Sequence, residues 1–124
     1  MDLIALAKTG SGKTCAYAWP LIIHILDQPN MQLGDGPIGL VLVPTRELAS
    51  QIYYLIKKFS ECFKIRVACV YGGTGKYEMQ KALQEAPEVV VATPGRLIDL
   101  LSSGDKYTNL RRCTFVVLDE ADRM

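Results

Sequence analysis

The stretch that decides the fold is the octapeptide A-K-T-G-S-G-K-T, residues Ala7 to Thr14. It follows a short apolar run and precedes a segment with helical periodicity. This order of strand, glycine-rich loop and helix is typical of a phosphate-binding P-loop. Gly10 and Gly12 allow a tight turn that brings backbone N–H groups to an anion, and the positive end of the following helix adds to the attraction.

The polar side chains of the octapeptide predict how a nucleotide would be held. Lys13 is expected to reach the β- and γ-phosphates, and the Thr14 hydroxyl is expected to take a Mg²⁺ position. Ala7 stands where the general pattern has its first glycine. A glycine- and serine-rich turn with a surface lysine is the alternative interpretation of so short a match.

Composition limits what kind of protein these 124 residues can form. The length suits one domain, and 49% hydrophobic with 22% charged residues is typical of a globular chain. The net charge of +1 provides no strong field for a nucleic acid. Any contact with RNA or DNA must therefore come from a local arrangement of side chains and backbone.

The cysteines and the histidine point to no metal site. The four cysteines, Cys15, Cys62, Cys69 and Cys113, include no C-x-x-C pair, which favours reduced thiols inside a cell. His24 lies in an apolar helical segment and is interpreted as a packed or surface residue. Because the sequence has neither an apolar stretch of roughly 18 residues nor a signal-peptide layout, we expect an intracellular protein without a membrane partner.

Apolar runs alternate with helical periodicity along the whole chain. Strands are expected at 3–6, 38–43, 66–70, 89–92 and 114–118, and helices at 13–27, 46–59, 77–85 and 97–101. Pro20 predicts a kink or an early break in the first helix. The apolar positions expected on these two helices are Ala16, Trp19, Ile22, Ile23 and Leu26 in the first, and Leu48, Ile52, Leu55, Ile56 and Phe59 in the second.

The alternation predicts an α/β fold, a parallel sheet with helices on both faces. In such sheets ligands bind beyond the carboxyl ends of the strands. The polar segments 7–14, 44–47, 72–73, 93–96 and 119–122 all follow predicted strands. We therefore expect this edge of the sheet to form one functional surface.

Asp119 and Glu120 follow the last predicted strand directly. An aspartate at a strand end can hold Mg²⁺, usually through water, and an adjacent glutamate can orient and activate the water that attacks a γ-phosphate. A solvated acidic turn is the alternative. The preceding P-loop and buried strand favour the nucleotide site.

Five short motifs occur in a fixed order: A-K-T-G-S-G-K-T, P-T-R-E-L at 44–48, Gly72-Gly73, T-P-G-R at 93–96 and D-E-A-D at 119–122. Together they resemble the first RecA-like domain of a DEAD-box RNA helicase, over nearly the whole chain. Alanine is the residue that this family has at the position of Ala7. The resemblance implies a RecA-like P-loop NTPase domain, and residues 1–124 would be an incomplete helicase ATP-binding domain.

The resemblance also implies roles, with ATP and Mg²⁺ as cofactors. Lys13, Asp119 and Glu120 would be catalytic, Thr14 and Asp119 would hold the metal, and Asp122 would couple the site to a later Ser-Ala-Thr motif. The phosphates would be bound by Ala7, Lys8, Thr9, Gly10, Ser11, Gly12, Lys13 and Thr14. The sugar-phosphate backbone of RNA would be bound, independently of base sequence, by Pro44, Thr45, Arg46, Gly72, Gly73, Thr93, Pro94, Gly95 and Arg96.

The physical chemistry of these residues agrees with an RNA-binding role, although structural alternatives exist. Paired glycines allow close backbone approach, the start of a helix can donate to a phosphate, and arginine supplies charge-assisted contacts. The alternatives are a helix cap at Pro44-Thr45, a surface pair at Arg46-Glu47 and a helix start at Thr93-Pro94. We expect solvated faces at Lys57-Lys58 and Arg111-Arg112, and packing at Trp19, Tyr53 and Tyr54.

The parent activity implied by the resemblance is ATP binding and hydrolysis coupled to local RNA duplex unwinding or RNP remodelling. The segments 34–39, 71–75 and 108–112 look similar to members that act in pre-mRNA splicing, which implies spliceosomal partners and a nuclear location. Two alternatives are a non-catalytic, nucleotide-gated RNA clamp and a different P-loop enzyme. The presence of Glu120 argues against the clamp, and the motifs at the other strand ends argue against the different enzyme.

The chain lacks parts that the family has. It contains no glutamine motif before the first strand, no Ser-Ala-Thr motif and no second RecA-like domain. In the family the second domain supplies arginine fingers, and an arginine finger is worth about 10³ to 10⁵ in the rate of hydrolysis. Both ends of the chain look cut, and the chain alone is expected to be inactive. In domains of this type the strand after the acidic motif lies between the P-loop strand and the acidic-motif strand. Its absence predicts a gap in the sheet and an unstable chain.

Overall fold

The computed structural model describes residues 3–7, 11–32, 35–71, 76–102 and 108–119. Strands and helices alternate along the chain as the sequence predicts. In chain order they are β1 Leu3–Ala7, α1 Ser11–Leu26, β2 Gly39–Leu42, α2 Arg46–Ser60, the short 3₁₀ helix η1 Glu61–Phe63, β3 Val67–Val70, α3 Lys76–Gln84, β4 Val89–Ala92, α4 Pro94–Leu101 and β5 Phe115–Asp119.

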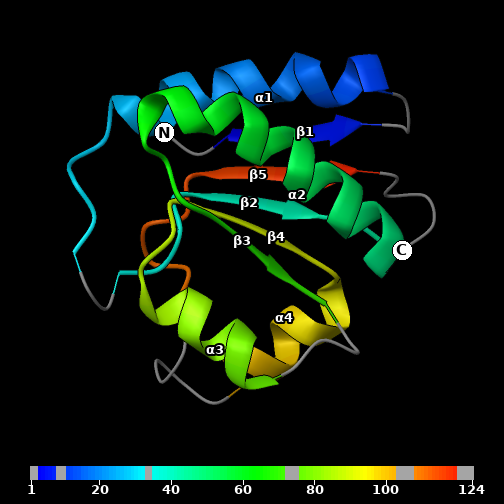
Figure 1. Cartoon of the computed structure of the whole chain (residues 1–124), viewed down its shortest axis with the longest axis vertical. Coiled ribbons are helices and arrows are strands. Elements are labelled where there is room, and N and C mark those ends of the chain that lie inside the picture. Colours follow the sequence, from blue (N-terminus) through cyan, green and yellow to red (C-terminus); the bar gives the residue numbers. More distant parts are fainter. Residues whose placement is uncertain (1–2, 8–10, 33–34, 72–75, 103–107, 120–124) are drawn as a thin grey trace.

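The strands form one sheet with helices on both faces (Figure 1). The sheet has five strands in the order β1-β5-β2-β4-β3, and every pairing is parallel. Helices α1 and α2 cover one face, and α3 and α4 cover the other (Figure 1). A buried apolar cluster fills each interface, one around Leu21, Val41 and Ile56 and one around Leu40, Met79 and Leu97. The predicted fold class is confirmed.

The order of the strands corrects the expectation of a gap. Strand β1 pairs directly with β5, from Leu3 opposite Phe115 to Ala7 opposite Asp119. Unpaired N–H and C=O groups in a buried sheet cost free energy, and direct pairing of the two strands satisfies them. The reason for expecting an unstable chain is therefore removed.

Helix α1 differs from its prediction in two ways. It runs without a break through Pro20, which lies with Ala16 on the exposed side, where water can reach a carbonyl that has lost its amide donor. Its buried stripe also lies about one position away from the predicted one. Trp19, Ile23 and Leu26 are exposed, whereas the buried residues are Tyr17, Ala18, Leu21, Ile22 and Ile25.

The tryptophan and the histidine of α1 have structural roles. Trp19 makes edge-to-face contacts with Phe59 and Phe63, at centroid distances of 5.6 and 6.2 Å. The His24 Nε2 atom lies 2.6 Å from the Thr114 hydroxyl. These contacts confirm that Trp19 and His24 serve packing.

None of the helices in the described part of the chain has the length and apolar run needed to cross a bilayer.

The expectation that Arg112 is solvated is wrong. Its guanidinium donates to the Pro29 carbonyl at 2.7 Å and to Asp35 Oδ2 at 3.0 Å. Asp35 also accepts a hydrogen bond from the Gln32 backbone N–H. This bond, as the larger cause, and the bond from Arg112 both lower the pKa of the Asp35 carboxyl. Arg112 therefore fastens the segment before β2 to the segment before β5, whereas Lys57 and Lys58 are exposed as expected.

Candidate functional site

The carboxyl ends of the strands lie in one row at the same edge of the sheet. Ala7 is level with Asp119, and Leu42 is level with both Leu118 and Ala92. Val70, at the end of β3, is level with Ala92 as well. The strands that precede the predicted site segments therefore all end at one edge of the sheet (Figure 1), as the sequence predicts.

The octapeptide connects β1 to α1 at this edge. Ala7 is the last residue of β1, and Ser11, Gly12, Lys13 and Thr14 form the first turn of α1. Lys8, Thr9 and Gly10 lie outside the described residues. The first turn has no acidic residue, so nothing in it offsets the positive end of the helix dipole. The start of α1 is thus placed and charged as an anion site requires.

Asp119 ends β5 next to Ala7, and its side chain is only 4% exposed. The Tyr17 hydroxyl, from α1, donates to Oδ2 of this carboxylate at 3.0 Å. The other oxygen, Oδ1, is buried and has no hydrogen-bond partner among the described residues. A buried carboxylate oxygen without a partner suits Mg²⁺ or a water bound to it, since oxygen is the ligand that hard cations prefer. Glu120 and Asp122 lie outside the described residues.

Tyr17 is a site residue that the sequence analysis missed. Its polar tip lies beside Asp119, while its ring belongs to the buried cluster between α1 and the sheet. The available signal was its position three residues after Thr14, because residues at this spacing share one face of a helix. In a segment that is almost entirely apolar, a tyrosine is naturally interpreted as a residue of the hydrophobic core.

The start of α2 is capped by its own side chain. Thr45 precedes the helix, and its hydroxyl accepts from the Leu48 backbone N–H at 3.2 Å. Arg46 Nε lies 3.4 Å from Glu47 Oε1, with side-chain exposures of 62% and 70%. Such an exposed pair contributes little to stability. The cap and the surface pair are both present, as the alternatives proposed, and they leave the Arg46 guanidinium at the surface.

The start of α4 is arranged differently. Thr93 occupies the cap position and Pro94 the first turn, but Thr93 makes no side-chain capping hydrogen bond. A Cβ added to Gly95 would meet no atom of the described residues within 4 Å. The Arg96 Nε atom is buried without a hydrogen-bond partner in the described part of the chain, and Nη1 is 4.0 Å from Asp99 Oδ2. This helix start has no side-chain cap, and the Nε atom of its arginine lacks an acceptor among the described residues. Gly72 and Gly73 lie outside the described residues.

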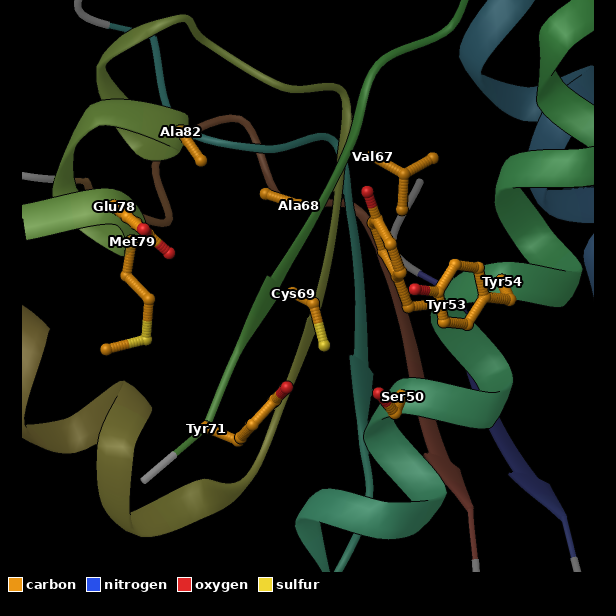
Figure 2. A pocket seen from close by; sticks show the side chains of 10 residues that line it. All are labelled: Ser50, Tyr53, Tyr54, Val67, Ala68, Cys69, Tyr71, Glu78, Met79 and Ala82. Carbon is orange, nitrogen blue, oxygen red and sulfur yellow. The ribbon is translucent and has the colours of Figure 1, made fainter. Parts of the chain in front are cut away.

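A groove of about 330 Å³ lies between α2, β3 and α3, and none of the predicted site residues lines it. Figure 2 shows Tyr53 and Tyr54 of α2 on one side, Glu78 and Met79 of α3 on the other, and Cys69 of β3 between them. The groove runs along β3, which is the edge strand on the side of the sheet away from β1. It lies apart from the nucleotide end of the sheet, since β1 and β5 are at the opposite side.

The cysteines are expected to differ in reactivity. Burial raises the pKa of the Cys69 thiol to about 11, whereas Cys62 is exposed. Because the thiolate is the reactive form, iodoacetamide at about pH 8 should label Cys62 at least about tenfold faster than Cys69. Mass spectrometry of a labelling time course measures both rates. Equal rates at the two positions would contradict the assigned burial of Cys69.

The chain is similar to known proteins along its whole length. The family model described as DEAD/DEAH box helicase matches residues 1–124. The ATP-dependent RNA helicase DDX42 of Gallus gallus is 54% identical over 99% of this chain and 13% of its own length. The probable ATP-dependent RNA helicase DDX46 of Homo sapiens is 55% identical over 99% of this chain and 12% of its own length. The chain thus spans about an eighth of these relatives.

A solved structure agrees with the sequence comparisons. The crystal structure of the yeast DEAD-box splicing factor Prp28 superposes with a TM-score of 0.86 at 36% identity, covering 99% of this chain and 29% of that one. The two structures share the architecture of a parallel sheet with helices on both faces. With the family model matched from the first residue to the last, the chain belongs to the DEAD/DEAH box helicase family.

Proposed function

We propose that this chain is the ATP-binding and RNA-binding part of a DEAD-box RNA helicase, in which ATP binding and hydrolysis drive local RNA unwinding or RNP remodelling. The observation that carries the proposal is Asp119, buried at the end of β5 beside Ala7 with one carboxylate oxygen unpartnered. The relatives of this chain are named ATP-dependent RNA helicases. By analogy with the family, turnover requires a second RecA-like domain.

The proposed roles follow from the starts of three helices, α1, α2 and α4. The first turn of α1 and Lys13 hold the phosphates, and Thr14 and Asp119 hold Mg²⁺, which when bound neutralises charge on the phosphates. Glu120 orients the attacking water and Asp122 couples this site to the rest of the enzyme. The RNA backbone lies over the starts of α2 and α4, where Arg46 is exposed and the first turn of α4 lacks a side-chain cap.

The test is nucleotide-dependent RNA binding in the longest natural chain that carries these residues. Fluorescence anisotropy of a labelled single-stranded RNA is measured with Mg²⁺ and a non-hydrolysable ATP analogue, and again without the nucleotide. We expect tight binding only with the nucleotide, and equally for RNAs of different sequence. Binding that ignores the nucleotide, or that requires one base sequence, would contradict the proposal.

Gly95→Ala separates RNA binding from folding. The added methyl meets no described atom within 4 Å, and alanine is better than glycine in a helix by about 1 kcal/mol, so thermal stability should be unchanged or higher. If RNA lies against this turn, the methyl intrudes on it and the RNA affinity falls several-fold. Anisotropy and thermal melting measure the two effects. Unchanged RNA affinity would remove Gly95 from the interface.

A second candidate of another class is a nucleotide-gated RNA clamp that does not hydrolyse ATP. The retained Glu120 favours the enzyme.

A finer proposal is a role in splicing, with spliceosomal partners and a nuclear location; its support is the likeness to Prp28, which is described as a splicing factor. Imaging of the tagged protein and the RNAs that co-purify with it test this part, and a purely cytoplasmic signal would count against it.

A further inference from the structure

We propose that Tyr17 is a positioning residue, which holds the Asp119 carboxylate so that Oδ1 is the oxygen presented to the Mg²⁺ of the bound nucleotide. The inference rests on the proposed function, because it assigns a role within the same site. Tyr17 lies outside both the octapeptide and the acidic motif. The inference concerns how the side chain of Asp119 is oriented.

The contact joins two elements that are far apart in sequence. Tyr17 and Asp119 are 102 residues apart, and the hydroxyl–carboxylate distance is 3.0 Å. Both residues are almost fully buried, at 6% and 4% exposure. The Tyr17 ring is part of the apolar cluster that includes Leu21 and Val117. A ring packed in this way cannot swing aside, so its hydroxyl is a fixed donor.

The carboxylate is held asymmetrically. Oδ2 accepts the Tyr17 hydrogen bond, while Oδ1 is buried and unpartnered among the described residues. The terminal torsion of an aspartate is broad, so without a fixed donor the plane of the carboxylate could rotate. The hydrogen bond from Tyr17 fixes this plane, with one oxygen bonded to Tyr17 and the other left as the open acceptor. A buried oxygen without a partner is costly unless a ligand completes it.

Tyr17 also links the aspartate to the phosphate-binding turn. Thr14 lies three residues earlier in α1, and residues at this spacing are neighbours on one helix face. The same helix therefore carries the proposed hydroxyl ligand of the metal and the donor that orients the proposed carboxylate ligand. The Tyr17 hydrogen bond fixes the end of β5 relative to the start of α1. It therefore sets the position of Asp119 relative to Thr14, the two proposed metal ligands.

The test measures how much Mg²⁺ strengthens nucleotide binding, using ADP in the longest natural chain that carries these residues. The dissociation constant is determined with Mg²⁺ and with EDTA, and Mn²⁺ in place of Mg²⁺ gives an EPR spectrum of the metal. Tyr17→Phe keeps the ring and removes the donor. Since groups that orient a metal ligand are typically worth 10- to 100-fold in metal affinity, Tyr17→Phe should reduce the gain from Mg²⁺ by about tenfold. The affinity in EDTA should be unchanged, and the Mn²⁺ signal should broaden.

Two further variants complete the test. Tyr53→Phe removes the hydroxyl of a half-buried tyrosine on α2 that packs against the same cluster, and it should leave the gain from Mg²⁺ unchanged. Tyr17→para-aminophenylalanine places an N–H donor at the same position. It should fold and bind the metal within about twofold of the wild type, which keeps the test decisive if Tyr17→Phe is too unstable to titrate.

The outcomes separate the inference from the proposed function. If wild-type protein does not bind ADP, or binds it equally with and without Mg²⁺, the proposed function fails. If the wild type responds to Mg²⁺ and Tyr17→Phe responds equally, only the role of Tyr17 is overturned. An amino variant that folds but loses the response to Mg²⁺ would overturn that role as well.

Discussion

Replacing Asp119 with asparagine is expected to lower ATP turnover by at least about a hundredfold. Groups that only orient a metal ligand are worth about 10- to 100-fold, and a direct ligand should be worth no less. Asparagine keeps the volume of a residue that is 4% exposed, and its amide oxygen can still accept from Tyr17. The loss would therefore come from the missing charge and not from misfolding. Steady-state ATP hydrolysis with saturating RNA measures it in the longest natural chain that carries these residues.

Asp99→Asn is the matched control for this change. Asp99 lies in α4 with its side chain 71% exposed, and its carboxylate makes a 4.0 Å ion pair with Arg96. Removing an exposed charge of this kind should leave turnover within about twofold. Turnover in Asp119→Asn as high as in Asp99→Asn would mean that Asp119 does not hold the metal.

The largest loss of stability is expected from Gly36→Ala. A Cβ at Gly36 would overlap the Asn109 backbone oxygen, and both residues are buried. Relief requires the segment before β2 to separate from the segment before β5, where Arg112 joins them. Forced overpacking typically costs about 1–3 kcal/mol and occasionally more. Because a backbone oxygen cannot turn aside as a side chain can, we expect a cost above about 3 kcal/mol in the free energy of unfolding.

Urea denaturation followed by circular dichroism measures this cost. Gly95→Ala is the matched control, since the same methyl there meets no described atom within 4 Å. The midpoint for Gly36→Ala should fall well below that of the wild type, and the midpoint for Gly95→Ala should not fall. Equal midpoints for the two variants would show that the contact between Gly36 and Asn109 is not close in solution.

The strand ends were predictable because the relevant signals are local. Continuous apolar runs followed directly by polar motifs identify buried parallel strands and the edge where ligands bind. Ala7, Leu42 and Ala92 end their strands at or within one residue of the predicted positions. Thr45 likewise caps α2 as its type and position suggest.

The face of α1 could not be predicted in this way. The segment from Ala16 to Leu26 is apolar on nearly every side, so periodicity does not select the buried stripe. The choice of Tyr17, Leu21 and Ile25 over Trp19 and Ile23 depends on how the helix lies against the sheet. The direct pairing of β1 with β5 is likewise a property of the assembled sheet.

The missed polar contacts share another cause. Arg112 reaches Asp35 across 77 residues, and Tyr17 reaches Asp119 across 102. Each residue looks ordinary in its own neighbourhood, Arg112 as part of a basic pair and Tyr17 as part of an apolar helix. Only the three-dimensional structure brings the partners together, and only there does the open Oδ1 of Asp119 become visible.

The most direct test of the central claim is the effect of RNA on ATP hydrolysis. In the longest natural chain that carries these residues, single-stranded RNA should accelerate Mg²⁺-dependent hydrolysis. Glu120→Gln should stop turnover while keeping nucleotide-dependent RNA binding, because it removes the group that activates water and leaves the phosphate and RNA contacts. A hydrolysis rate that does not respond to RNA, or full turnover in Glu120→Gln, would contradict the assignment of this edge of the sheet as an RNA-coupled ATP site.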